Sequence, residues 1–120
     1  QLYVDVGAQV DAANARQRQA LAQYRSAIQN AFREVRDAIV AQAKTREQFE
    51  AEDKRAATLR EALRLAKLRY QSGISSQLDV LDSERSLLAA ELNRSDAQRA
   101  RRAAVADLFK ALGGGWQPGS

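Results

Sequence analysis

Cysteine and histidine are both absent from the 120 residues of this chain. Their absence excludes disulfides, the usual zinc sites, serine–histidine and cysteine–histidine nucleophile pairs, and a histidine general base. Carboxylate pairs such as Glu50 and Glu52 remain, but they lie within a continuous helical pattern that shows no pocket. The sequence therefore predicts a chain that is not an enzyme, with no catalytic residue, no metal site and no cofactor.

Proline, glycine and aromatic residues are also scarce. The chain has one proline and six glycines, and aromatics make up 6% of it. This composition disfavours a thick globular core and favours long helices that pack as thin pairs. No run approaches the roughly 18 consecutive apolar residues of a membrane-spanning helix. No signal peptide is visible, and since the chain opens on Gln1 rather than Met, we expect a processed product or an excised fragment.

The net charge is +4, and basic and acidic residues are mixed along the chain. Such mixing is typical of a solvated helix surface, which we favour over a nucleic-acid footprint. We therefore expect no nucleic-acid partner.

Residues 8–71 contain neither proline nor glycine, which predicts one long helix. Apolar residues recur there at three- and four-residue steps: Leu21, Tyr24, Ile28, Ala31, Val35, Ile39, Phe49, Ala56, Leu59, Leu63, Ala66 and Tyr70. The stripe weakens between positions 42 and 55, which indicates a different neighbour, a local change of winding, or water. Residues 1–7 stand apart because Leu2, Tyr3, Val4 and Val6 favour a strand. They are interpreted as a strand end or a cloning remnant.

A turn is predicted at residues 72–77, where Gly73 ends the first helix and Ser75 or Ser76 caps the next. The second helix is expected over residues 78–112, followed by a flexible tail over 113–120. Its expected apolar stripe is formed by Leu78, Leu81, Leu88, Leu92, Ala100, Ala104, Leu108 and Leu112. The fold class is therefore all-α, a long antiparallel, coiled-coil-like helical hairpin.

The two predicted helices differ in length, roughly 96 Å against 54 Å at 1.5 Å per residue. The shorter helix can cover only the half of the longer one that lies nearest the turn. Residues from about 8 to 38 then carry an apolar stripe without a partner in this chain, and an isolated helix cannot bury such a stripe. We therefore expect self-association through Tyr24, Ile28 and Val35, or a larger protein that supplies the missing helices.

Several segments together resemble the C-terminal part of the TolC-like outer-membrane factors, most closely the branch that serves RND-type efflux pumps. The segments are RYQSGISSQLDVLD at 69–82, SERSLL at 83–88, LFKALGGGW at 108–116, AQVDAANA at 8–15 and NAFREVRDA at 30–38. The resemblance implies a trimeric outer-membrane channel of a Gram-negative bacterium, with long helices in a periplasmic α-barrel. This chain matches the last helical hairpin, and the parts that contact the membrane are missing from it.

The resemblance also implies roles for residues at the turn. Members dock the helical hairpin of a periplasmic adaptor (membrane fusion protein) at this tip, which here comprises Tyr70, Ser72, Gly73, Ile74 and Ser75. The aspartates Asp79 and Asp82 match acidic residues at the channel aperture. From the residues alone, Gly73 is equally well explained as a helix C-cap, and for the two aspartates we favour a role in complementing the helix N-terminus. Some members carry an arginine of a closing network at the place of Ser75, so that network is not expected here.

Three other interpretations compete. The spacing of Arg64, Leu68 and Ser75 fits the tip of an adaptor hairpin, but the pattern is sparse and no lipoyl-like sequence accompanies it. A structural coiled coil without a transport role would be indifferent to Gly73→Arg. A basic coiled coil on nucleic acid would bind duplex in a salt-dependent manner. The favoured hypothesis is a fragment of a passive efflux channel.

Overall fold

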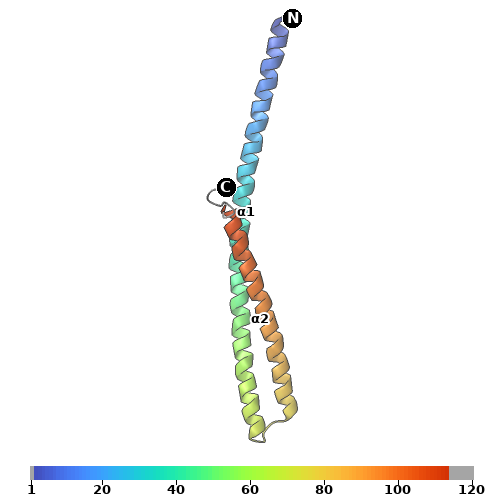
Figure 1. Ribbon diagram of the computed structural model, residues 1–120, viewed down its shortest axis with the longest axis vertical. Coiled ribbons are helices and arrows are strands. Elements are labelled where there is room, and N and C mark those ends of the chain that lie inside the picture. Colours follow the sequence, from blue (N-terminus) through green and yellow to red (C-terminus); the bar gives the residue numbers. More distant parts are fainter. Residues whose placement is uncertain (1, 114–120) are drawn as a thin grey trace, which may run out of the picture. The chain divides into compact units, whose positions relative to one another are not determined.

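The computed structural model describes residues 2–113, which form two helices (Figure 1). Helix α1 is Leu2–Gln71, with 70 residues, and helix α2 is Gln77–Ala111, with 35 residues. Residues 72–76 form the turn between them. The predicted all-α helical hairpin is confirmed. Within the described residues, neither helix has a stretch long and apolar enough to cross a membrane.

Helix α1 starts earlier than the sequence indicated. Residues 2–7 are helical, so the strand end expected over residues 1–7 is wrong for these positions, while Gln1 lies outside the described residues. Strand propensity predicts a strand only weakly, because it reflects how side chains pack on a sheet. Residues 2–113 contain no strand against which these residues could pair. Extending an existing helix adds one hydrogen bond per residue, and Asp5 complements the dipole in the first turn. Most of the expected tail, residues 114–120, lies outside the described part.

The chain divides into two units, Gln1–Asp37 and Ala38–Ser120. In the first unit, every side chain from position 2 to position 34 is exposed. The large apolar ones are Leu2, Tyr3, Val4, Val6, Val10, Leu21, Tyr24, Ile28 and Phe32. This unit therefore has no core of its own.

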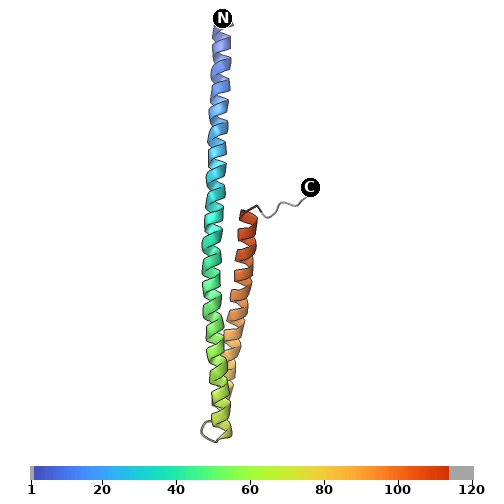
Figure 2. The same cartoon turned by 90° about the vertical axis from the view of Figure 1, so that its left-hand side faces the viewer.

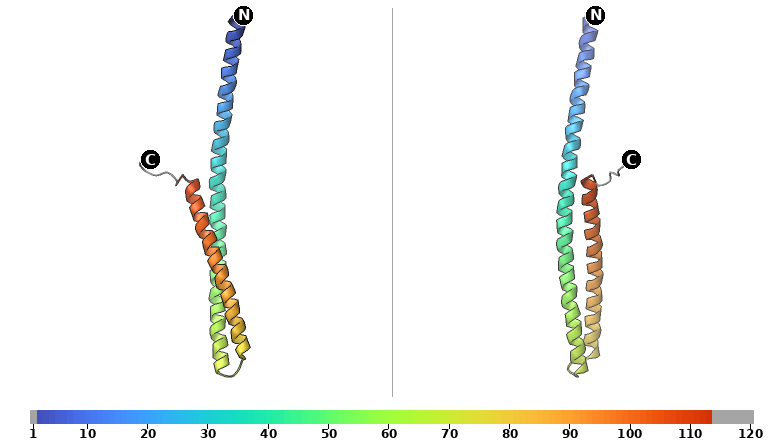
Figure 3. Two further views of the ribbon diagram at one scale, coloured as in Figure 1. Left: turned by 45° about the vertical axis from the view of Figure 1, so that its right-hand side comes forward. Right: turned by 60° about the vertical axis from the view of Figure 1, so that its left-hand side comes forward.

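The second unit is the hairpin proper. Three further views show α2 running back beside the later part of α1 (Figures 2 and 3). Apart from Gln98, its buried and half-buried positions recur in steps of three and four along both helices, which is the heptad pattern of a coiled coil. We call these positions the seam: Ala38, Gln42, Thr45, Phe49, Glu52, Ala56, Leu59, Leu63 and Ala66 on α1, and Val80, Ser83, Leu87, Ala90, Arg94, Ala97, Arg101, Ala104, Leu108 and Ala111 on α2.

All five buried residues of the chain's described part are alanines, namely Ala56, Ala66, Ala90, Ala97 and Ala104. Small side chains at these positions allow the two backbones to approach closely. The α1 pattern runs through positions 42–55 without a change of winding. The weak stretch in the sequence therefore reflects a different neighbour, since the polar seam residues Arg94 and Arg101 of α2 lie there.

The apolar stripe expected on α2 is mostly wrong. Ala104 and Leu108 belong to the seam, but the expected Leu112 is 66% exposed, and four leucines nearer the turn are exposed as well. These four, Leu78, Leu81, Leu88 and Leu92, form a separate stripe that we call the leucine face. Both stripes have helical spacing, and the hairpin buries the one with smaller side chains. The leucine face is left for another partner.

Candidate functional site

The tip of the hairpin is built around Gly73. The Ile74 N–H donates to the Arg69 carbonyl at 2.8 Å, and the Gly73 N–H donates to the Tyr70 carbonyl at 3.0 Å. These two bonds are the Schellman pattern of a helix C-terminus, which places the residue after the cap in the left-handed region. Gly73 has φ +75°, a conformation that glycine adopts without steric cost. The sequence Ser72-Gly73 thus ends α1 by a local mechanism.

Ser76 starts the second helix. Its backbone is extended, and its Oγ accepts a hydrogen bond from the Asp79 N–H at 3.4 Å. The expected cap was Ser75 or Ser76, and the structure selects Ser76. Ser75 is instead half-buried, and its Oγ has no hydrogen-bond partner among residues 2–113.

The residues predicted for adaptor docking gather at this turn but differ in exposure. Ile74 is 77% exposed and Tyr70 is 46% exposed, while Ser75 is half-buried. Leu78, 63% exposed, adds a further apolar side chain that the predicted set did not include. A Cβ added to Gly73 would meet no atom within 4 Å, so the surface beside these side chains is open. The tip therefore presents apolar groups to solvent around a residue with no side chain.

A groove, which we call the tip groove, begins beside the turn and runs between the helices. It is lined by Ala62, Leu65, Ala66, Arg69, Ser75, Asp79, Asp82 and Ser83. The structure thus brings Ser75 together with both predicted aperture aspartates. Arg69 and Ser83 were missed as lining residues, although both lie in the segments that carry the resemblance. Ser83 lies on the seam and Arg69 lies beside it, so their positions in the heptad repeat would have predicted that they line this groove.

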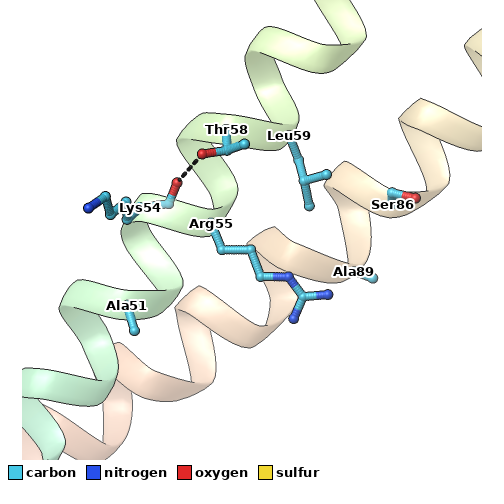
Figure 4. A pocket seen from close by; sticks show the side chains of 7 residues that line it. All are labelled: Ala51, Lys54, Arg55, Thr58, Leu59, Ser86 and Ala89. Carbon is cyan, nitrogen blue, oxygen red and sulfur yellow. Dashed lines mark hydrogen bonds between the residues drawn. The ribbon is translucent and has the colours of Figure 1, made fainter.

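A second groove lies farther from the turn (Figure 4). Its lining residues are Ala51, Lys54, Arg55, Thr58, Leu59, Ser86 and Ala89. Arg55 reaches from α1 toward α2 near Ala89, and Leu59 also points toward α2, whereas Lys54 points away (Figure 4). The Thr58 hydroxyl donates to the Lys54 carbonyl at 3.1 Å, which satisfies it within the helix. The walls are mostly small or aliphatic, which suits packing rather than chemistry.

Cross-helix ion pairs complete the hairpin. The Arg60 guanidinium lies 3.5 Å from Glu91, and Arg94 donates to Asp53 at 2.6 Å. No ion pair within the described residues involves Asp79 or Asp82. Residues 2–113 also contain no group of three or more acidic side chains placed to hold a metal ion. The arrangement offers surfaces for protein contacts and two exposed carboxylates that form no ion pair within the described residues.

Comparison with known proteins finds a family model described as "outer membrane efflux protein" that matches residues 2–114. The chain is 44% identical over 112 residues to "Outer membrane protein OprJ" of Pseudomonas aeruginosa, covering 93% of this chain and 23% of that protein. It is 42% identical over 110 residues to "Cation efflux system protein CusC" of Escherichia coli, covering 92% and 24%.

Among solved structures, a crystal structure of a membrane protein from Pseudomonas aeruginosa is similar, with a TM-score of 0.68 and 43% sequence identity. The match covers 83% of this chain and 23% of that chain. The chain therefore spans about a quarter of the length of the relatives it matches.

Proposed function

Because this chain belongs to the outer membrane efflux protein family, we propose that it is the periplasmic hairpin of a passive export channel, whose tip docks the adaptor of an efflux pump. Its location is the outer membrane and periplasm of a Gram-negative bacterium, as the sequence predicted. In this proposal the channel is a passive conduit for the exported substrates, and an RND-type pump in the inner membrane supplies the energy for export.

The observation that carries the docking role is the exposed apolar tip around Gly73. Ile74 is 77% exposed and Leu78 is 63% exposed. Each lies within a few residues of a capped helix end, where a polar side chain could have stood instead. Exposed apolar groups of this kind mark contact surfaces when they are gathered rather than scattered. The missing side chain at Gly73 lets a partner helix approach the backbone closely. The tip groove beside it supplies Arg69 for polar contacts.

The aperture role is assigned to Asp79 and Asp82. They are three positions apart, hence on one helix face, and both are exposed. In a trimer each aspartate becomes a ring of three carboxylates, which favours cations at a channel mouth. Neither aspartate forms an ion pair within the described residues, although Arg69 lines the same groove and Asp79 lies in the first turn of α2.

The trimeric α-barrel supplies partners for the surfaces left open here. The leucine face of α2 and the exposed stripe of the first unit both have helical spacing, which suits neighbouring helices of the same assembly. Tyr24 and Ile28 continue the heptad phase of the seam by whole seven-residue steps. Tyr24 leads through Ala31 to Ala38, and Ile28 leads through Val35 to Gln42. The same packing rule can therefore extend along the whole of α1.

The proposal is tested by adaptor capture in the full-length channel. Gly73→Arg places a long side chain on the tip, and Gly113→Arg is its matched control. Gly113 follows the end of α2, has φ +89°, and likewise has nothing within 4 Å of an added Cβ. Both variants therefore carry a similar backbone cost, about 1–2 kcal/mol for a left-handed non-glycine residue.

We expect Gly73→Arg to abolish co-purification with the adaptor and efflux in cells, while Gly113→Arg retains both. Equal adaptor binding by Gly73→Arg and the unmodified channel would instead support a structural coiled coil without a docking role. Loss of adaptor binding in both variants would show that the effect is not specific to the tip.

A further inference from the structure

The seam changes character about halfway along the hairpin. Near the tip it holds Leu59, Leu63 and Leu87, which are half-buried apolar side chains. Farther from the tip, α1 contributes Gln42, Thr45, Phe49 and Glu52, and α2 contributes two arginines, several alanines and, near its end, Leu108. Phe49 is thus the one large apolar side chain that α1 places in this part of the seam.

Two guanidinium groups lie over the Phe49 ring. The Cζ atoms of Arg94 and Arg101 both lie 5.2 Å from the ring centroid, within the distance of a cation–π contact. The two arginines are one heptad apart on α2, about 10.5 Å along the helix axis. All three side chains are half-buried, so solvent screens these contacts less than it would on an open surface.

Asp53 completes the cluster from the α1 side. It lies one turn after Phe49, and its Oδ1 accepts a hydrogen bond from the Arg94 Nε at 2.6 Å. Arg94 therefore contacts two side chains of α1, one through its charge on the ring and one through a hydrogen-bonded ion pair. The cluster joins the two helices at a place where the neighbouring seam residues Ala97 and Ala104 offer little side-chain surface.

Polar residues at seam positions lower stability in general, but they select one register. The contacts of this cluster favour one register of α2 against α1. A slide of α2 by one heptad would leave Phe49 with at most one of its two guanidinium contacts and would separate Asp53 from Arg94. An alanine seam by itself resists such a slide weakly, because equivalent alanines replace one another.

We propose that Phe49, Asp53, Arg94 and Arg101 form a clasp that docks the far part of α2, residues 94–111, onto α1 in a single register. The turn around Gly73 fixes the hairpin at one end, and the clasp fixes it at the other. Loss of the clasp releases residues 94–111 and leaves the leucine-containing part near the tip paired.

The clasp is tested by distance measurements between spin labels, which is direct because the chain has no native cysteine. One labelled pair, Ala41→Cys with Ala103→Cys, lies beyond the clasp. A second pair, Thr58→Cys with Ala89→Cys, lies on its tip side. All four positions are exposed, so the labels do not disturb the seam.

Phe49→Leu keeps an apolar side chain but removes the aromatic face, and Phe32→Leu is the control at a Phe that is 73% exposed. We expect Phe49→Leu to broaden the 41–103 distance distribution, because residues 94–111 are released, while the 58–89 distribution stays narrow. Amide exchange in residues 97–108 should rise about five- to thirtyfold. Phe32→Leu should change neither quantity.

Arg101→Gln provides a second variant that leaves the Asp53–Arg94 pair in place, and it should broaden the 41–103 distribution less than Phe49→Leu does. An unchanged 41–103 distribution in both variants would overturn the proposal. Equal broadening of both labelled pairs would also overturn it, because the cluster would then support the whole hairpin rather than its far part.

Discussion

Ala90→Leu is the most direct perturbation of the hairpin's packing. Ala90 is 0% exposed in the seam, as is Ala56, and both lie where the helices approach closely. A leucine there adds three carbon atoms to a site with no free space. Overpacking of this kind costs typically about 1–3 kcal/mol. For a unit of this size, each kcal/mol lowers the melting temperature by roughly 4–8 °C.

The assay is thermal and urea unfolding followed by helical circular dichroism. Ala89→Leu is the matched control, because it makes the same exchange one position earlier in the same helix, at an exposed residue. Surface exchanges of this kind usually stay within about 0.5 kcal/mol. A stability of Ala90→Leu equal to that of Ala89→Leu would refute the alanine seam, and so would a greater loss for Ala89→Leu.

Four further predictions follow from single contacts and surfaces. Ser76→Ala should cost about 0.5–2 kcal/mol in urea unfolding, since it removes the N-cap of α2, whereas Ser86→Ala at an exposed position should cost little. Tyr24→Gln combined with Ile28→Gln should weaken self-association in analytical ultracentrifugation, and a chain already monomeric before substitution would contradict this. Asp79→Asn with Asp82→Asn should lower the cation preference of the full-length channel in bilayer recordings, and an unchanged preference would remove the aperture role. The hydrogen bond from Arg64 lowers the pKa of the exposed Glu61 carboxylate. The stabilising effect of this hydrogen bond is therefore lost as the pH falls through the lowered pKa. Arg64→Gln should raise the pKa of Glu61 toward its ordinary value, which an NMR titration would measure.

The hairpin was predictable because its signals are local. The long stretch without Gly or Pro, the break at Ser72-Gly73 and the serine cap each specify backbone geometry through neighbouring residues. The start of α1 was missed because strand formers such as Val4 and Val6 follow a helix when one is already present to extend.

The buried face of α2 was not predictable from hydrophobicity. The leucine face is the more apolar stripe, yet the hairpin buries Ala90, Ala97 and Ala104. The choice depends on how closely two particular helices approach, and that is a tertiary property. Phe49 was assigned to the apolar stripe, but its contacts with Arg94 and Arg101 could be predicted only once the antiparallel pairing of the helices is known.

Photo-crosslinking from the tip tests directly whether this part of the channel contacts the adaptor. A photoreactive residue replaces Ile74 in the full-length channel in cells, and the same exchange at Ile39, which is 51% exposed in the second unit, is the control. We expect the adaptor to be captured from position 74 and not from position 39. Capture of the adaptor from position 39 but not from position 74 would contradict this expectation.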